Sequence, residues 1–221
     1  MISRKLRLWI ALLSTIIVQS VKAALVTNTG GKDFTYFAYG SNVCLSTMTN
    51  LRGIDPVAST AAVLPNHELR FNIPGVPFIE PAWASVEPTE GKLVHGVLYR
   101  LTEEDFNAVC RSEGVPLGYV LHRCRPIPYT GNGRDAGQQA IVSGKSGVSA
   151  FTLRAPAQLR RPKKYDIAPS KSYLDVILRG AEEYRLDEEY IEYLCKIEKG
   201  TTLIGDGTAY EILKSAERRK R

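Results

Sequence analysis

The heptapeptide YFAYGSN, from Tyr36 to Asn42, joins a hydrophobic stretch to a short polar end. Tyrosine and phenylalanine suit a half-buried strand, whereas Gly40 lets the backbone approach another group closely. Ser41 and Asn42 add hydrogen-bonding side chains at the same place, so this strand end could present N–H groups and a hydroxyl to a carboxylate or carbonyl. The alternative is an ordinary strand-to-helix turn in which Ser41 or Asn42 caps the next helix.

Glu113, in the sequence SEGVPLGY, is a candidate proton carrier because it lies at the predicted end of a helix. That helix should begin at Thr102, a hydroxyl cap followed three residues later by an acid, and should end where Gly114 follows Glu113. A carboxylate at this end faces the negative pole of the helix dipole, which opposes its ionisation and suits a group that exchanges protons near neutral pH. The alternative is a solvated surface glutamate.

Several tyrosines lie on or beside elements that we expect to be buried, where each could direct its hydroxyl at a ligand: Tyr36, Tyr39, Tyr119 and Tyr173. Buried tyrosines more often bond to a neighbouring backbone group, so the two readings stay open from the pattern alone.

The order of predicted elements indicates an α+β domain. Strands are expected at 35–39, at 61–72 with a turn at LPNHEL, at 83–88 and 93–101 joined by a hairpin at TEGK, and near 118–125 and 138–153. A short helix is expected at 44–51, surface loops at the proline-rich 73–83 and the charged 160–170, and two late helices capped by Ser170 and Asp187. Strands thus fill the first two-thirds and helices the last third, which favours a curved or closed sheet with helices packed against it.

The net charge of +6 comes from the two ends of the chain. Residues 1–23 carry four basic side chains and no acid, and residues 214–221 carry five basic side chains and one acid. The body between them holds 20 basic and 22 acidic residues, so we expect no nucleic-acid partner.

The first 23 residues have the pattern of a signal peptide. Basic residues precede the apolar run 8–18, which is too short for a spanning helix, and small residues at 21 and 23 predict cleavage before Ala24. We therefore expect a signal peptide or signal anchor at 1–23, a domain at 24–205 and a basic tail at 206–221, in a protein of the secretory pathway or a secreted one. An uncleaved leader would be the sole membrane attachment, and the alternative is a cytoplasmic protein with an apolar first helix or a mis-assigned start.

The cysteines lack the tight spacing of a disulfide scaffold or a zinc ribbon, and buried free thiols are expected at Cys44, Cys110, Cys124 and Cys195.

Taken in order, these motifs resemble the γ-glutamylcyclotransferases over roughly residues 34–200. The resemblance rests on YFAYGSN, WASVEP, VHGVLYRLTEEDF, SEGVPLGY, PSKSYLDVILRGAEEYRL and EEYIEYL. It implies a mixed sheet folded into a small barrel or curved sheet with helices outside, and a cavity that holds a γ-glutamyl group. It also implies that Glu113 is catalytic and that the substrate is bound by Tyr36, Phe37, Ala38, Tyr39, Gly40, Ser41, Asn42, Tyr119 and Tyr173.

The activity that the resemblance implies needs neither metal nor cofactor. The α-amine of a γ-glutamyl compound loses a proton, attacks the γ-amide carbonyl and closes a five-membered lactam, so 5-oxoproline forms and an amine leaves. Glu113 would take the ammonium proton and return it to the leaving nitrogen, which makes the enzyme a carbon–nitrogen lyase. Some relatives act on glutathione adducts in the biosynthesis of sulfur-bearing natural products, and the apolar segment 73–83 favours a leaving group more apolar than a plain amino acid.

Two other classes of function compete with this enzyme. The same cavity could belong to a non-catalytic binding module for γ-glutamyl or other acidic small molecules, with Glu113 structural. The leader and the basic tail alone suggest a membrane-anchored interaction protein. An intact strand-end loop together with Glu113 favours the enzyme, because binding alone requires no proton carrier.

Overall fold

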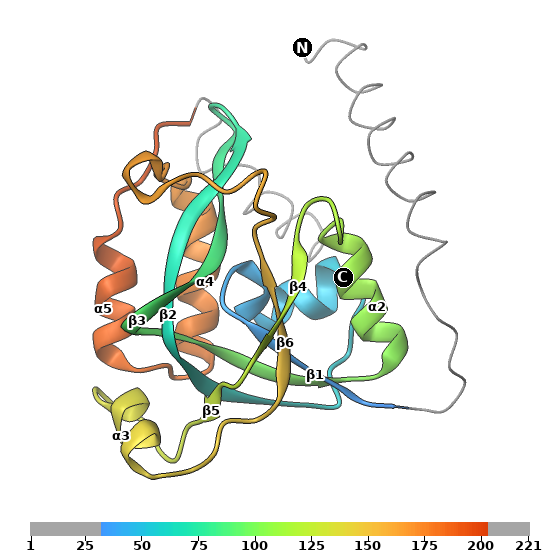
Figure 1. Ribbon diagram of the computed structural model, residues 1–221, viewed down its shortest axis with the longest axis vertical. Coiled ribbons are helices and arrows are strands. Elements are labelled where there is room, and N and C mark those ends of the chain that lie inside the picture. The colour runs from blue at the N-terminus through green and yellow to red at the C-terminus, as the bar shows by residue number, and fades with distance from the viewer. Residues whose placement is uncertain (1–31, 203–221) are drawn as a thin grey trace.

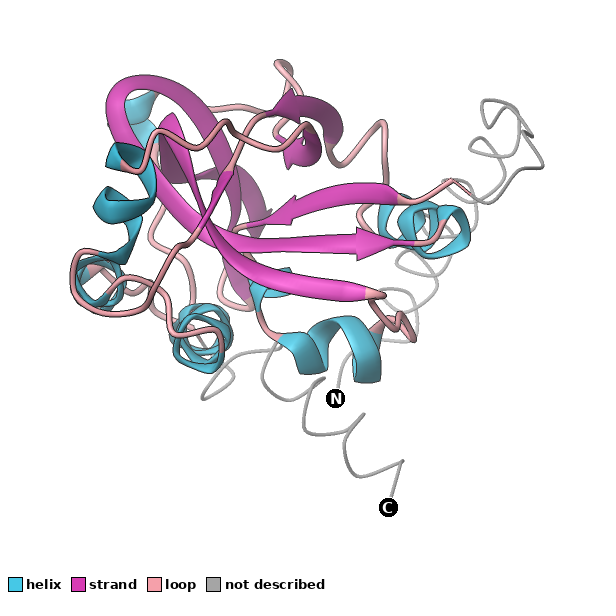
Figure 2. Ribbon diagram, turned by 90° about the horizontal axis from the view of Figure 1, so that it is seen from below, coloured by secondary structure: helices cyan, strands magenta, loops and turns pink. Residues whose placement is uncertain are grey.

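The computed structural model describes residues 32–202, and the expected leader and basic tail lie outside them. One mixed sheet runs through the molecule in the order β4-β6-β1-β3-β2-β5, with β1 parallel to β6 and antiparallel to β3. Its strands are β1 (Phe34–Ala38), β2 (Ala58–Val76), β3 (Glu80–Leu101), β4 (Val120–Cys124), β5 (Ile127–Pro128) and β6 (Ala150–Arg154). The sheet is curved but not closed, with β4 and β5 at its edges, and the predicted α+β class is confirmed (Figure 2).

Helices surround this sheet (Figure 1). Figure 1 shows α4 and α5 together on one side, α2 on the other and α3 near one end. Their bounds are α2 (Glu103–Ser112), α3 (Ala136–Val142), α4 (Lys171–Glu183) and α5 (Glu188–Lys196), with shorter turns at η1 (Ser41–Val43), η2 (Thr47–Leu51) and η3 (Lys163–Tyr165).

The predicted helix starts are confirmed, and at each of them the capping side chain accepts hydrogen bonds from N–H groups two or three residues further along the chain. Thr102 accepts the N–H of Asp105, Ser170 accepts that of Tyr173, and Asp187 accepts those of Glu189 and Tyr190. The predicted end of α2 is confirmed as well, since Glu113 is its C-cap and Gly114 follows with φ +65°.

The segment from 58 to 101 differs from its prediction. It forms two long antiparallel strands whose hairpin turn lies between Val76 and Glu80, so the expected turn at LPNHEL and the hairpin at TEGK are wrong. The expected surface loop at 73–83 is reduced to this turn at 77–79, because the residues on either side of it pair with each other. The pairing instead shifts register between Pro65 and His67, where residues 89–92 leave the ladder and Asn66 adopts φ +57°.

Two further predictions are corrected. The strand expected over 138–153 is confined to β6, because residues 138–142 belong to α3. All four cysteines are free as predicted, but Cys195 is exposed on α5, whereas Cys44, Cys110 and Cys124 are buried.

The side chain of His95 connects β3 to the helices α3 and α5. Its side chain is buried, its Nδ1 lies 2.5 Å from the Tyr129 hydroxyl, and its ring stacks on Tyr190 at 4.5 Å. A Cβ on Gly137 would lie 2.2 Å from His95 Cε1, so α3 contacts the imidazole directly. Burial lowers the pKa of His95 to about 4, although the charge of Asp187 acts in the opposite direction.

We expect this histidine to make the fold acid-sensitive. Since the unfolded chain titrates His95 near its usual pKa of about 6.5, it binds this proton before the folded protein does as pH falls. The free energy of unfolding is therefore highest above about pH 6.5 and falls as the pH is lowered towards about 4. The fall caused by His95 is at most about 3 kcal/mol. The free energy of unfolding, measured with urea at about pH 6.5 and about pH 4, should fall between these pH values in the wild type and should fall less in His95→Gln. An equal pH dependence in the two proteins would contradict it.

Candidate functional site

One pocket brings together eight of the ten residues that the sequence nominated. Its empty space is about 270 Å³, a volume that includes open solvent at the mouth. It is lined by Tyr36, Tyr39, Gly40, Ser41, Asn42, Ala84, Glu113, Tyr119, Leu153 and Tyr173. These residues come from the segment of β1 and η1, the start of β3, the end of α2, the residue before β4, the end of β6 and the start of α4. Because these elements are far apart in the sequence, the pocket exists only in the folded chain.

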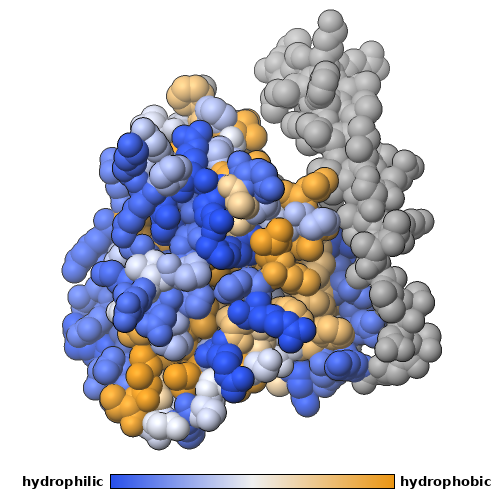
Figure 3. All heavy atoms as spheres, viewed as in Figure 1, coloured by the Kyte–Doolittle hydropathy of each residue, from blue (hydrophilic) through white to orange (hydrophobic). Residues whose placement is uncertain are grey.

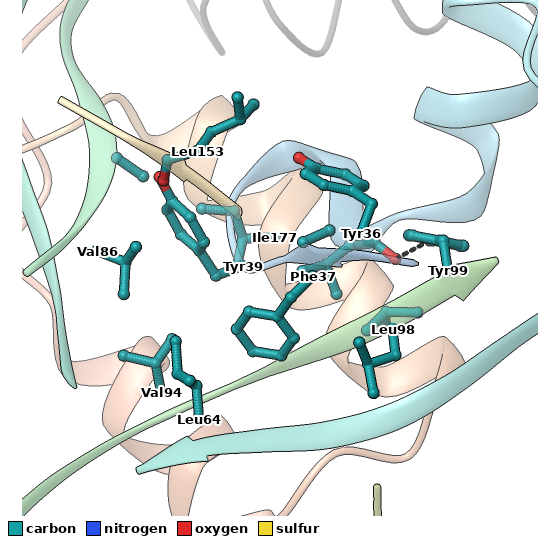
Figure 4. Close-up of a cluster of buried hydrophobic side chains, with 14 of the residues drawn as sticks. Tyr36, Phe37, Tyr39, Leu64, Val86, Val94, Leu98, Tyr99, Leu153 and Ile177 are labelled. Carbon is teal, nitrogen blue, oxygen red and sulfur yellow. Dashed lines mark hydrogen bonds between the residues drawn. The ribbon is translucent and has the colours of Figure 1, made fainter. Parts of the chain in front are cut away.

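The other two nominated residues do not line the pocket. Phe37 and Ala38 are completely buried in the core. Figure 4 shows the ring of Phe37 pointing away from the hydroxyls of Tyr36 and Tyr39, and the alternation of side chains along β1 places Phe37 on the opposite face from its neighbour Tyr36. Phe37 contributes to the framework through its carbonyl, which accepts a hydrogen bond from Thr152 at 2.7 Å.

Asn42 turns towards the pocket instead of capping a helix. Its side-chain amide donates to the Tyr36 hydroxyl and to Glu113 Oε1, each at 3.0 Å, and its oxygen accepts from Arg52 Nε at 2.8 Å. Gly40 precedes η1, and no side chain caps that turn. The capping alternative for Ser41 and Asn42 is therefore wrong.

Glu113 is held at the back of this cluster by an ion pair that the sequence did not reveal. Arg52 Nη2 donates to Glu113 Oε1, and the two side chains are 13% and 16% exposed. The surface-glutamate alternative is therefore wrong, and the arginine charge offsets the opposing dipole at the end of α2. No local sequence signal identifies Arg52, since 61 residues separate it from its partner.

The pocket tyrosines remain protonated hydroxyls. Burial raises the pKa of Tyr36, Tyr39, Tyr119 and Tyr173 far above the usual value, and the Glu113 charge adds to the shift in each. Tyr39 donates to the carbonyl of Leu153 at 2.6 Å and Tyr119 to that of Ala84 at 2.8 Å. These groups therefore shape the pocket, and Glu113 is the one carboxylate among the residues that line it.

Tyr173 fixes the depth of the pocket beside the strand-end glycine. A Cβ on Gly40 would lie 3.1 Å from the Tyr173 hydroxyl, which explains why the smallest residue stands there. The ring of Tyr173 is held edge-on by Trp83 at 5.4 Å, and the N-terminus of α4 is held by Glu80, which accepts hydrogen bonds from the backbone and hydroxyl of Ser170.

A second hollow is larger, about 1200 Å³ on the same measure, and is lined by His95, Tyr190 and several carboxylates. Three of those carboxylates already serve the fold. Glu68 pairs with Lys163 at 2.7 Å, Asp135 accepts from Gln139 at 2.6 Å, and Asp187 caps α5. We place the candidate active site in the smaller pocket, where an ionisable group faces a set of hydrogen-bonding groups.

Within residues 32–202, no group of three or more His, Cys, Asp or Glu side chains is arranged to hold a metal ion.

No helix in the described part of the chain combines the length and apolar character that a bilayer crossing requires. Figure 3 shows a largely hydrophilic face over β2, β3 and α5. Large exposed apolar side chains elsewhere include Leu117, Leu121 and Val142.

The chain is similar to known proteins along most of the described region. A family model described as the AIG2-like family matches residues 93–194. The gamma-glutamyl cyclotransferase gliK of Aspergillus fumigatus is 32% identical over 190 residues, which cover 78% of this chain and 64% of the relative. The gamma-glutamylcyclotransferase of Bos taurus is 30% identical over 172 residues, which cover 76% of this chain and 80% of the relative.

The fold has solved counterparts. A structure of a gamma-glutamyl cyclotransferase matches with a TM-score of 0.64 at 22% identity, over 85% of this chain and 99% of the other. The chain spans 57–64% of the length of the four fungal relatives that it matches.

We expect Asn42→Ala to lower the free energy of unfolding by about 1–3 kcal/mol, because it leaves the buried Tyr36 hydroxyl and part of the Glu113–Arg52 pair without a partner. Urea denaturation measures the change. Asn132→Ala, at an exposed position outside the pocket, is the matched control and should stay within about 0.5 kcal/mol of the wild type. Equal stability of the two variants would contradict the role given to Asn42.

Proposed function

Because this chain belongs to the γ-glutamylcyclotransferase family, we propose that it cleaves γ-glutamyl compounds by forming 5-oxoproline and releasing an amine. One observation carries the proposal. Glu113 lines the pocket with its Oε1 bonded to Asn42 and Arg52, while the strand-end glycine and serine line the same space.

The reaction divides naturally among these groups. Glu113 accepts a proton from the α-ammonium, and the freed amine nitrogen attacks the γ-carbonyl carbon to close the ring. The carbon–nitrogen bond to the leaving group then breaks as Glu113 returns its proton to that nitrogen, and the second proton of the attacking nitrogen passes to the released amine, which leaves as an ammonium. Hydrogen-bond donors are needed for the oxyanion and for the α-carboxylate, and the backbone of Gly40 and Ser41 together with the uncharged hydroxyls of Tyr36 and Tyr173 supports that role.

We propose that the substrates are γ-glutamyl conjugates with a partly apolar leaving group, such as glutathione-derived thioethers of a secondary-metabolite pathway. Trp83 supports this class because the residue is 37% exposed while its ring packs on the pocket residue Tyr173. Leu117, in the segment between Glu113 and Tyr119, is 59% exposed and offers further apolar surface. Exposed apolar side chains beside a polar pocket favour a ligand with a polar head and an apolar body.

We expect Glu113→Gln to lower the rate of 5-oxoproline formation by about 10²–10⁴-fold. The glutamine oxygen keeps the bonds from Asn42 and Arg52, so the fold survives, but the side chain cannot accept a proton. Chromatographic measurement of 5-oxoproline from γ-glutamyl-alanine and from glutathione tests this. The control Glu198→Gln, at an exposed position, should behave as the wild type.

Two outcomes of that assay would reject the proposal. Near wild-type turnover by Glu113→Gln removes this carboxylate from the mechanism. Tight binding of γ-glutamyl compounds by a wild-type protein that releases no 5-oxoproline from any of them identifies a binding module instead.

Blocking the substrate amine should abolish the reaction. N-acetylation of the γ-glutamyl α-nitrogen removes both the nucleophile and the charge that Glu113 recognises, so a loss of 10⁴-fold or more is expected. Exchanging the released alanine for Cys-Gly or a bulky thioether should change kcat/KM by roughly 10–200-fold at most. Cleavage of the acetylated compound would instead indicate hydrolysis by an external nucleophile.

A further inference from the structure

We propose that Arg52 is a positioning residue that fixes Glu113 Oε1 and thereby leaves Oε2 as the atom that exchanges the proton with substrate. This inference rests on the proposed cyclotransferase activity. It gives a task to a side chain that is absent from the pocket lining, so Arg52 acts through Glu113 and not by touching substrate.

The guanidinium of Arg52 spans the two segments that build the site. Its Nε donates to Asn42 Oδ1 at 2.8 Å, its Nη1 to Ser112 Oγ at 2.5 Å, and its Nη2 to Glu113 Oε1. Asn42 belongs to the turn after β1, whereas Ser112 and Glu113 form the end of α2. One planar cation therefore sets the distance between the strand-end loop and the carboxylate.

Both hydrogen bonds to the carboxylate converge on one oxygen. Oε1 accepts from Arg52 Nη2 and from Asn42 Nδ2 at 3.0 Å, and no group among residues 32–202 donates to Oε2. Turning the carboxylate out of this orientation would break a charge-assisted bond and an amide bond together. The carboxylate is thus held through Oε1, and Oε2 is the oxygen that these two bonds leave available to substrate.

Solvent does little to weaken this arrangement. The side chains of Arg52 and Glu113 are only 13% and 16% exposed, so their attraction is screened far less than that of a surface ion pair. Arg52 is itself fixed where η2 ends, since its backbone N–H bonds to the carbonyl of Thr47 at 3.2 Å.

The geometry requires a guanidinium and not merely a positive charge. Three nitrogens of Arg52 reach three different residues in one plane, and a lysine ammonium is a point charge on a flexible stem. Lysine at this position would keep charge balance but would lose the fixed orientation of the carboxylate.

Steady-state kinetics of 5-oxoproline formation by Arg52→Lys and Arg52→Gln test the inference. We expect kcat to fall by about 10²-fold in both, the loss associated with a misplaced catalytic group, while KM changes by less than about fivefold. Arg70→Gln is the matched control. Arg70 is 11% exposed and forms a comparable ion pair with Asp166 outside the pocket, so its loss should lower the melting temperature and leave kcat unchanged.

Each result decides the question. Wild-type kcat in Arg52→Lys would show that charge alone suffices and would overturn the inference. The inference would also be overturned if the loss of activity in Arg52→Gln and in Arg70→Gln equalled the fraction of each variant that is unfolded under the assay conditions.

If neither Arg52 variant folds, Ser112→Ala keeps the Arg52–Glu113 pair and removes the Nη1 contact. It should lower kcat about tenfold at unchanged KM, and wild-type kcat would overturn the inference. A wild-type protein that forms no 5-oxoproline rejects the proposed activity itself.

Discussion

The ion pair between Glu113 and Arg52 is the interaction around which the site is organised. A carboxylate at the C-terminal end of a helix is opposed by the helix dipole, and removing it from water adds a further cost. Arg52 and the amide of Asn42 compensate both effects, and each comes from the segment after β1. The contact between this segment and α2 is thus what permits an ionisable group to lie half-buried beside a cluster of hydroxyls.

Close packing of a few backbone groups gives the pocket its remaining walls. The backbone of Ala84 accepts a hydrogen bond from Tyr119 and donates one to the hydroxyl of Tyr173 at 3.4 Å, so one residue of β3 anchors two aromatic side chains. Ser170 begins α4 and is itself bound by the buried Glu80, which places Tyr173 against Gly40. Because these groups are closely packed and largely buried, small changes in the framework are transmitted directly to the site.

Features with a local physical cause could be predicted from the sequence. The caps Thr102, Ser170 and Asp187, the strand-end loop and the position of Glu113 each depend on neighbouring residues, and the structure bears them out. Features with a distant cause could not. Arg52 acquires its partner only through folding, and the prolines and glycines of 58–101 indicate turns when read locally, whereas long-range pairing absorbs them as irregularities of two long strands. The same limit explains why the pattern of residues 138–142 predicts a strand, although they belong to α3, a helix that Gly137 holds against His95 and Asp187.

The bulge in the β2–β3 pair also makes the molecule accessible to engineering. Residues 89–92 stand outside the ladder and are mostly exposed, and the backbone N–H of Gly91 is bonded only to the side chain of Asn66, at 3.1 Å. Backbone that is neither buried nor part of a ladder tolerates added residues. An epitope or a fluorophore-binding peptide placed between Glu90 and Gly91 would therefore lie apart from the residues that line the pocket, so it could report on the protein while the chemistry continues undisturbed.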